Sequence, residues 1–458
     1  MTVKTLDAVD SAIDPKEFFA KYVQTRIPVV IKGLIRDEGF KASRWVRASP
    51  YTHLGYLSKR AGHTTVQVEP IHPGSKQFGT DAKRVEMKFS EFLDGLKQED
   101  GEQRYLTTQY SADSEGLHDD GEKEGGVTVY PPPTNALRDD FPIAPKITGK
   151  LVLQQHHDFH DNLYCLLAGH KRFVLFPPTQ ASNLYPHGKI DNIHPNGLIS
   201  YKHNVVRSDG LEAREAMRFR IKALGEKIAA TKGKREKKLE ALLEEAIDAE
   251  MDFLVEDGGD DDFDEIELDG EDGDEEFPED EDSDDGQEDT GSAANSRSRG
   301  KGKAKVTGKE DDEDDEPSSF SRIPTSALHQ HLSLPTTAVS IDSDPSTGFD
   351  LSKVSTPFVV DIDPGEMLYL PASWWHEVTS SSPDNSKSNV HMAFNYWFYP
   401  PDGLKTFDEP YQDDIVWGYL RGRANGMANG VEKAPELSLS KRKRDADRSS
   451  KKAKKAKY

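Results

Sequence analysis

Apolar residues along most of the chain fall in short runs of about four to eight positions, the length typical of β-strands. Gly and Pro lie between these runs and predict turns. Ala168-Gly169-His170 separates two of the densest runs and predicts the turn of a β-hairpin. Many short strands of this kind favour an antiparallel sandwich or jelly roll over a parallel α/β sheet. The predicted strands are 27–33, 64–69, 104–110, 163–167, 171–176, 358–362, 367–370 and 390–398.

Helical spacing of apolar residues marks fewer segments. Asp14-Pro15 offers an N-cap and a proline at the first helical position, so a helix should begin there and end near Thr25. Residues 88–96 predict a short amphipathic helix, and 413–425 a final one. Between 211 and 255, apolar residues recur at helical spacing among many charges. We expect one or two helices there that are largely exposed to solvent. If the chain breaks near Gly233, the two helices would form an αα-hairpin.

Charge is distributed unevenly over the 458 residues, whose formal net charge is -23. Residues 256–318 form an acidic tract with too few apolar side chains to fold, and the tail from Lys441 is strongly basic. The chain therefore divides into four predicted parts. These are the N-terminal part of a β-domain (1–205), an insert of charged helices and an acidic disordered tract (206–318), the C-terminal part of the same β-domain (319–425) and a disordered basic tail (426–458).

Cysteine content and hydropathy indicate the kind of cellular compartment in which the protein resides. Cys165 is the one cysteine, so no internal disulfide can form and a reducing environment is expected. The first residues lack the apolar segment of a signal peptide, and no apolar run reaches the roughly 18 residues of a membrane span. We expect a soluble intracellular protein without membrane association.

A cluster of potential metal ligands lies between two predicted strands. His156 and Asp158 are two residues apart, so on a strand they point to the same face, and Asn162 can join them. His376 follows an apolar strand and a Pro-containing turn and can supply a third ligand. Two imidazoles and one carboxylate suit non-haem Fe(II), although zinc accepts the same donors. These residues, with the spare candidates His157 and His160, could equally be core histidines or a surface patch.

Longer motifs around these residues resemble a known family. His156-x-Asp158-x-x-x-Asn162 is followed by a segment at 169–178 that reads Gly-His-Lys-Arg-Phe-Val-Leu-Phe-Pro-Pro. Residues 364–376 read Pro-Gly-Glu-Met-Leu-Tyr-Leu-Pro-Ala-Ser-Trp-Trp-His. This order resembles the JmjC/cupin-like Fe(II)- and 2-oxoglutarate-dependent oxygenases. It is most similar to their small hydroxylase branch, which includes the asparaginyl hydroxylase of hypoxia-inducible factor. The resemblance covers most of 14–205 and 319–400.

The resemblance implies a mainly β fold, a double-stranded β-helix (a cupin-like jelly roll) with flanking helices. It implies Fe(II) as cofactor and 2-oxoglutarate as co-substrate, which would be decarboxylated to succinate while a substrate C–H bond is oxidised. The implied metal ligands are His156, Asp158 and His376. The implied residues of the 2-oxoglutarate pocket are Lys171, Asn162, Tyr105, Asn395 and Trp397. Lys171 could otherwise be a solvated turn lysine, and Tyr105 a packed strand tyrosine.

Two features depart from the family pattern. Asp158 and His376 are 218 residues apart (376 minus 158), and the low-complexity insert accounts for most of this separation. Relatives also carry an extra strand and a small hydroxyl residue just before His-x-Asp, whereas here 150–155 runs directly into His156. Either 151–155 substitutes for that strand, or the sequence records a deletion, which would weaken the catalytic interpretation.

The sequence favours an oxygenase that hydroxylates a protein side chain in the nucleus. Two basic clusters at 441–444 and 451–455 resemble a bipartite signal for an import receptor, and the acidic tract suits a basic substrate such as a histone or ribosomal protein. Nucleic-acid binding by the tail is a weaker possibility. The alternatives are a methyl-lysine demethylase, a tRNA-base hydroxylase, or an inactive nuclear scaffold built on the insert and tail. Oligomeric state is not predicted.

Overall fold

The computed structural model describes residues 3–46, 50–72, 78, 83–97, 103–106, 109, 131–154, 159–202, 204–231, 233–257, 317–334, 348–381, 390–403 and 406–428. Apart from the last turn of α5, they belong to one compact unit formed by Met1–Phe253 and Asp315–Tyr458. The second unit, Leu254–Asp314, falls within the predicted insert. Most of the expected acidic tract (258–316) and of the basic tail (429–458) lies outside the described residues, whereas 426–428 belong to the last helix and not to a disordered tail.

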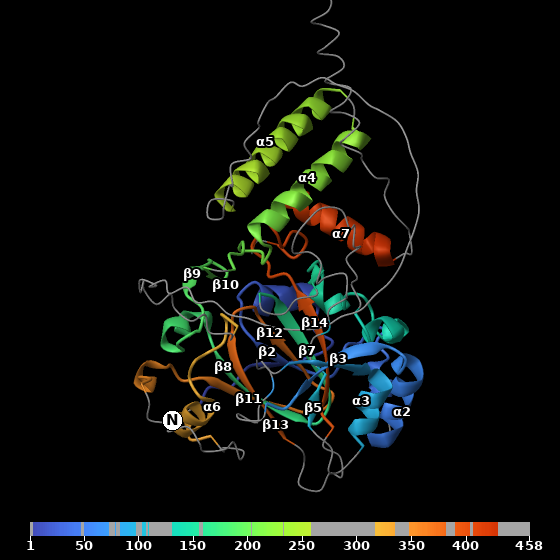
Figure 1. Ribbon diagram of the computed structural model, residues 1–458, viewed down its shortest axis with the longest axis vertical. Coiled ribbons are helices and arrows are strands. Elements are labelled where there is room, and N and C mark those ends of the chain that lie inside the picture. The colour runs from blue at the N-terminus through green and yellow to red at the C-terminus, as the bar shows by residue number, and fades with distance from the viewer. Residues whose placement is uncertain are drawn as a thin grey trace, which may run out of the picture. The chain divides into compact units, whose positions relative to one another are not determined.

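Two facing sheets form the centre of the fold (Figure 1). The larger sheet has the order β1-β2-β12-β7-β14-β6, and the smaller has the order β11-β8-β13. Every pair in them is antiparallel except β1 with β2. The strands of the larger sheet are β1 (Ala8–Asp10), β2 (Val29–Lys32), β6 (Leu153–Gln154), β7 (Asp161–Ala168), β12 (Met367–Leu370) and β14 (Met392–Phe398). Those of the smaller are β8 (His170–Phe176), β11 (Phe358–Ile362) and β13 (Trp375–Ser381).

The remaining strands form two small sheets, β4-β3-β5 and β10-β9. Their bounds are β3 (Thr65–Pro70), β4 (Val85–Lys88), β5 (Arg104–Tyr105), β9 (Ile190–Ile193) and β10 (Ile199–Tyr201). The α-helices are α1 (Pro15–Phe18), α2 (Pro50–Ala61), α3 (Phe89–Gly95), α4 (Ala213–Ala230), α5 (Lys234–Asp257), α6 (Thr325–Leu332) and α7 (Asp414–Ala428). Together they make a mainly β jelly roll with flanking helices, as the sequence predicted.

The predicted β-hairpin across Gly169 is wrong in its pairing. The turn exists, but β7 belongs to the larger sheet and β8 to the smaller, so consecutive strands cross between the sheets. Gly169 has φ +78° and the His391 side chain lies against its α-carbon, which leaves no room for a larger residue. The local turn signal was correct, but the strand partners are set by distant segments.

Alternation along the larger sheet separates its two faces. Odd-numbered positions of β7 pack outward against helices, in a core that contains Phe18, Trp45, Leu54 and Trp417. Even-numbered positions point between the sheets, because Leu166 packs with residues of the smaller sheet. One strand therefore contributes to two cores, and its inward face is the one available for a site.

The insert begins with the two helices that its spacing predicted. They separate at Gly233, which has φ +88°, and lie side by side with Arg218 of α4 within 3.5 Å of Glu250 of α5 (Figure 1). Arg220 of α4 reaches Asp413 beside α7, which ties this hairpin to the β-domain. The segment expected to replace the strand before His-x-Asp forms β6, paired with β14 at the sheet edge.

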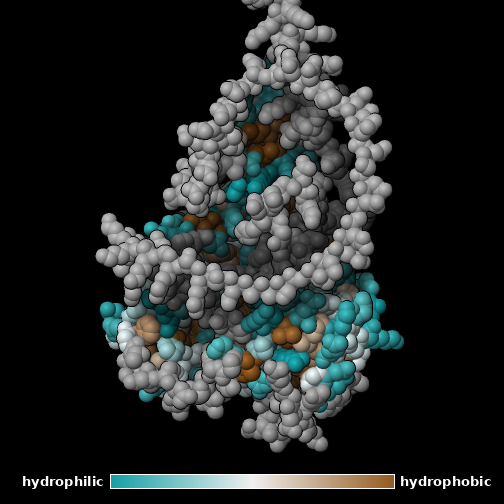
Figure 2. All heavy atoms as spheres, in the orientation of Figure 1, coloured by the Kyte–Doolittle hydropathy of each residue, from teal (hydrophilic) through white to brown (hydrophobic). Residues whose placement is uncertain are grey.

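Hydropathy of the described helices and of one face of the surface bears on membrane association. None of the helices in the described ranges is both long and apolar enough to cross a bilayer. On the face shown in Figure 2, hydrophobic residues form small separate spots on a mainly hydrophilic surface. Isolated spots of this kind are ordinary for a folded domain.

Candidate functional site

The inward faces of the two sheets enclose an apolar cluster, and the strand register shows which polar residues join it. The cluster comprises Val30, Leu166, Phe173, Leu175, Ile362, Leu368, Leu370 and Trp374. Residues directly opposite each other in an antiparallel pair lie on the same face. The partner of each predicted site residue therefore fixes the side on which it lies.

His376 lies on the inward face because it is opposite Leu175. Its Nδ1 is 2.9 Å from the carbonyl oxygen of Trp374, and since a carbonyl can only accept, Nδ1 is the donor. A neutral imidazole then carries its lone pair on Nε2. This is the tautomer that a metal ligand needs, so His376 fits the ligand role predicted for it.

Lys171 shares the same face, opposite Ile362 on one side and Ser380 on the other. Its ammonium group donates to the Ser380 hydroxyl at 2.5 Å. Burial lowers the pKa of Lys171, and no carboxylate pairs with it within the described part of the chain. A half-buried cation that faces the space between the sheets, with no carboxylate beside it among the described residues, is suited to an anionic ligand.

Asn162, Asn395 and Trp397 lie on the facing inward side of the larger sheet. Asn162 and Trp397 oppose each other, Asn162 also opposes Leu370, and Asn395 opposes Tyr164. The side-chain oxygens of both amides are buried and accept no hydrogen bond from the described residues. Such atoms are uncommon in folded proteins, and a bound ligand or water can supply the missing donor.

Tyr105 approaches the site from the small sheet β4-β3-β5, opposite Glu69 of β3. Burial raises the pKa of Tyr164, and the charge of Tyr105 raises it further, which places the two phenols near each other. Tyr164 packs against the inward cluster. Tyr105, although half-exposed, therefore lies at the rim of the space between the sheets.

The other expected ligands are not described. His156, Asp158 and the spare candidate His157 lie outside the described residues. Within the ranges that are described, no three His, Cys, Asp or Glu side chains gather as a metal site would require. His160 is buried with its ring against Tyr399, at 4.9 Å between centroids, so it is a core residue. The assignment of His156 and Asp158 stays a prediction.

Sequence reasoning missed a buried ion pair beside the motif. Arg26 and Asp161 form a two-pronged pair at 2.6 Å for both contacts, and Asp161 is fully buried. Arg26 precedes the first predicted strand, where a charged residue is ordinarily solvated, and Asp161 was one acid in a polar cluster. The two residues are 135 positions apart, so no local pattern in the sequence indicates that they pair.

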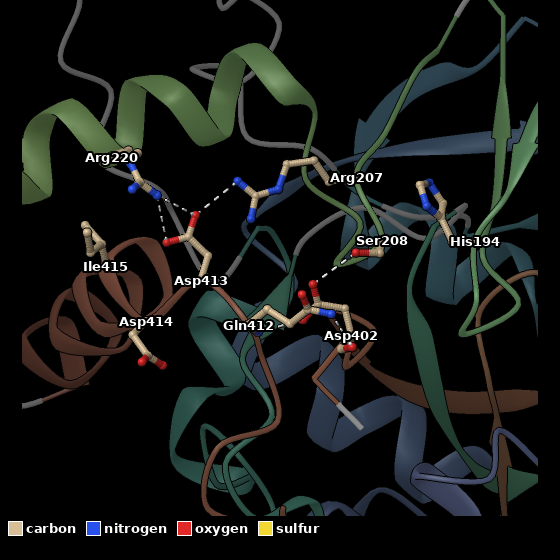
Figure 3. A pocket seen from close by; sticks show the side chains of 9 residues that line it. All are labelled: His194, Arg207, Ser208, Arg220, Asp402, Gln412, Asp413, Asp414 and Ile415. Carbon is tan, nitrogen blue, oxygen red and sulfur yellow. Dashed lines mark hydrogen bonds and ion pairs between the residues drawn. The ribbon is translucent and has the colours of Figure 1, made fainter. Parts of the chain in front are cut away.

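A pocket of about 630 Å³ lies elsewhere, between α4, α7 and the segment after β10 (Figure 3). Arg207 and Arg220 both reach Asp413, and Ser208 donates to Asp402. Two of its arginines thus share the carboxylate of Asp413 across the pocket, as the dashed lines in Figure 3 show. These ion pairs join α4 to the start of α7, which is a structural role and not a catalytic one.

Comparison with known proteins agrees with this geometry. The family model of the cupin-like domain matches residues 15–403. The chain is 36% identical over 441 residues to JmjC domain-containing protein 4 of Schizosaccharomyces pombe, covering 88% of this chain and 86% of that protein. It is 26% identical over 179 residues to tRNA wybutosine-synthesizing protein 4 of Neurospora crassa, 38% of this chain and 14% of that protein.

A third relative is JmjC domain-containing protein E of Dictyostelium discoideum, 32% identical over 59 residues, which are 13% of this chain and 17% of that protein. The family match spans both parts of the β-domain on either side of the insert. Members of this family are generally oxygenases of the Fe(II)/2-oxoglutarate type. The jelly roll, its inward polar face and these matches agree: this chain belongs to the cupin-like JmjC domain family.

Proposed function

We propose that this protein is an Fe(II)- and 2-oxoglutarate-dependent oxygenase that hydroxylates a protein side chain. The observation that supports it best is that five polar or aromatic residues from four different strands lie on the inward faces of the two sheets: His376 and Lys171 on the smaller sheet, and Asn162, Asn395 and Trp397 on the larger. Ordinary core packing would not gather a cation, two amides and an imidazole there. Fe(II) bound by His156, Asp158 and His376 would supply activation of O₂.

The protein's residues bind and orient in this proposal. Lys171, with Ser380 beside it, neutralises the distal carboxylate of 2-oxoglutarate. Asn162 and Asn395 turn their amides toward the co-substrate, and Trp397 forms a wall of the pocket. The Trp374 carbonyl holds His376 in the tautomer that presents Nε2. The apolar cluster behind them excludes water from the reacting groups.

The substrate class is proposed as protein, with tRNA as the second candidate. The acidic segment at 256–290, which contains no Lys or Arg, would attract a basic protein by its long-range field. The basic clusters at 441–444 and 451–455 support nuclear import. The similarity to a tRNA wybutosine-synthesizing protein favours RNA instead, although it covers 38% of this chain.

Isotope transfer distinguishes these substrates. The full-length chain is incubated with Fe(II), 2-oxoglutarate and ¹⁸O₂ in separate reactions with nuclear protein extract and with purified tRNA, and products are analysed by mass spectrometry. We expect one ¹⁸O atom on a protein side chain, absent with the His376→Ala variant. Label in tRNA alone would support the second candidate. Loss of a methyl group from lysine would identify a demethylase, and no label in either would favour the scaffold.

A further inference from the structure

The fully buried carboxylate of Asp161 connects three segments at the end of the β-domain where the site lies. Its Oδ1 accepts from Arg26 Nη2 at 2.6 Å and from the backbone N–H of Ala372 at 2.9 Å. Its Oδ2 accepts from Arg26 Nη1 and from the Tyr369 hydroxyl, both at 2.6 Å. All four acceptor positions of the carboxylate are therefore used, by residues far apart in the sequence.

The same network continues to His376 through the backbone of Arg26. The Trp374 indole N–H donates to the Arg26 carbonyl at 3.0 Å, and the Trp374 carbonyl accepts from His376 Nδ1 at 2.9 Å. Hydrogen bonds thus run from Asp161 through Arg26 and Trp374 to the imidazole. Asp161 itself lies three residues after Asp158.

Backbone strain is concentrated in the same network. Arg26 has φ +57° and Ser373 has φ +62°, although neither is glycine. Left-handed backbone is unfavourable for residues other than glycine, and it persists where surrounding contacts hold it. The Ser373 hydroxyl accepts from the Ile199 N–H at 2.8 Å, so the turn before His376 is fixed from a second side.

We propose that Asp161, Arg26 and Tyr369 are positioning residues that fix the turn bearing His376 relative to the start of β7. This inference rests on the proposed function. A buried ion pair is weak grounds for stability as such, because desolvation offsets much of the attraction. It is well suited to fixing register, and here it joins β7, β12 and the turn that leads to His376. Positioning groups behind metal ligands typically change metal affinity by about 10–100-fold when removed.

The test compares metal affinity among matched variants of the full-length chain. Mn(II) alone is the probe, and free Mn(II) is followed by electron paramagnetic resonance. Asp161→Asn keeps the shape and removes the charge, and Tyr369→Phe removes one of the four hydrogen bonds if the first variant folds poorly. Asp140→Asn is the control, because Asp140 is also buried and its side chain accepts from Trp45 and Tyr56, which are not part of the Asp161 network.

We expect Asp161→Asn to bind Mn(II) about 10–100-fold more weakly than the wild type, with a smaller loss for Tyr369→Phe. Asp140→Asn should bind as the wild type does, even if it unfolds more easily. Equal affinity in all four proteins would overturn the positioning role and leave the proposed function intact. Failure of the wild type to bind Mn(II) would overturn the proposed function and this inference with it.

A metal-free measurement gives an independent readout. Imidazole ¹⁵N shifts of His376, assigned with His376→Gln, report whether the proton is on Nδ1. We expect the Nδ1–H form in the wild type and in Asp140→Asn, and a mixture of tautomers in Asp161→Asn. An unchanged tautomer in Asp161→Asn together with unchanged Mn(II) binding would reduce Asp161 to a structural residue.

Discussion

Replacing Lys171 with methionine tests the proposed co-substrate pocket most sharply. The change keeps an unbranched side chain and removes the cation that faces the interior next to Ser380. A hydrogen bond to a charged group contributes about 1.5–3 kcal/mol. Since about 1.4 kcal/mol is tenfold in affinity, 2-oxoglutarate should bind about 10- to 150-fold more weakly. Anaerobic calorimetric titration of 2-oxoglutarate into the Mn(II)-loaded protein measures the loss.

Arg172 provides the control from the next position of the same strand. Its side chain points to the opposite face, where it pairs with Asp361 at 2.9 Å. Arg172→Met removes the same charge from β8 without touching the interior, so binding should change less than about threefold, the effect of a screened charge. Equal weakening by both variants would show a general field effect, and unchanged binding in Lys171→Met would refute the assignment of Lys171.

Three further predictions concern the fold. Asp161→Asn should lower the free energy of unfolding by about 3–5 kcal/mol, because it leaves the buried guanidinium of Arg26 unpaired. Asp10→Asn, in an exposed ion pair, should lower it by under about 1 kcal/mol. Equal midpoints of urea denaturation for the two variants would contradict this. Burial, and then Glu212, raises the pKa of Glu215 to about 7. The folded state therefore holds that proton more tightly, so stability should fall between about pH 4.5 and 7, and Glu215→Gln should flatten the slope; parallel pH profiles would refute this. Gly169→Ala should lower the melting temperature, since it combines a left-handed backbone with overlap against His391, and an unchanged melting temperature would show that the turn relaxes freely.

Local patterns predicted most of the elements but not all of their partners. The runs at 163–167 and 171–176 became β7 and β8, and the spacing at 211–255 became two helices that meet at Gly233. Their pairing was not local: β7 lies between β12 and β14, which follow it by about two hundred residues. Strand partners in a jelly roll depend on long-range contacts, whereas a turn signal reports only that the chain reverses.

The candidate site was predictable where a motif combined with alternation. Asn162, Lys171 and His376 follow family order in the sequence, and strand alternation places them on the facing inward sides of the two sheets. The Arg26–Asp161 pair was not predictable in this way. Its two charges come from separate segments that look polar and solvent-exposed, and only the fold buries them together. The hydrogen bonds that hold the turn before His376 are therefore visible in the structure and could not be predicted from the sequence pattern.

Succinate formation tests directly whether the protein is a 2-oxoglutarate-dependent oxygenase. The full-length protein is given Fe(II), 2-oxoglutarate and O₂, with nuclear extract as a source of substrate, beside His376→Ala and an anaerobic control. We expect that succinate appears with the wild type, depends on O₂ and Fe(II), and falls to background when the His376 imidazole is removed. Succinate at background in the wild type, or equal amounts from wild type and His376→Ala, would contradict it.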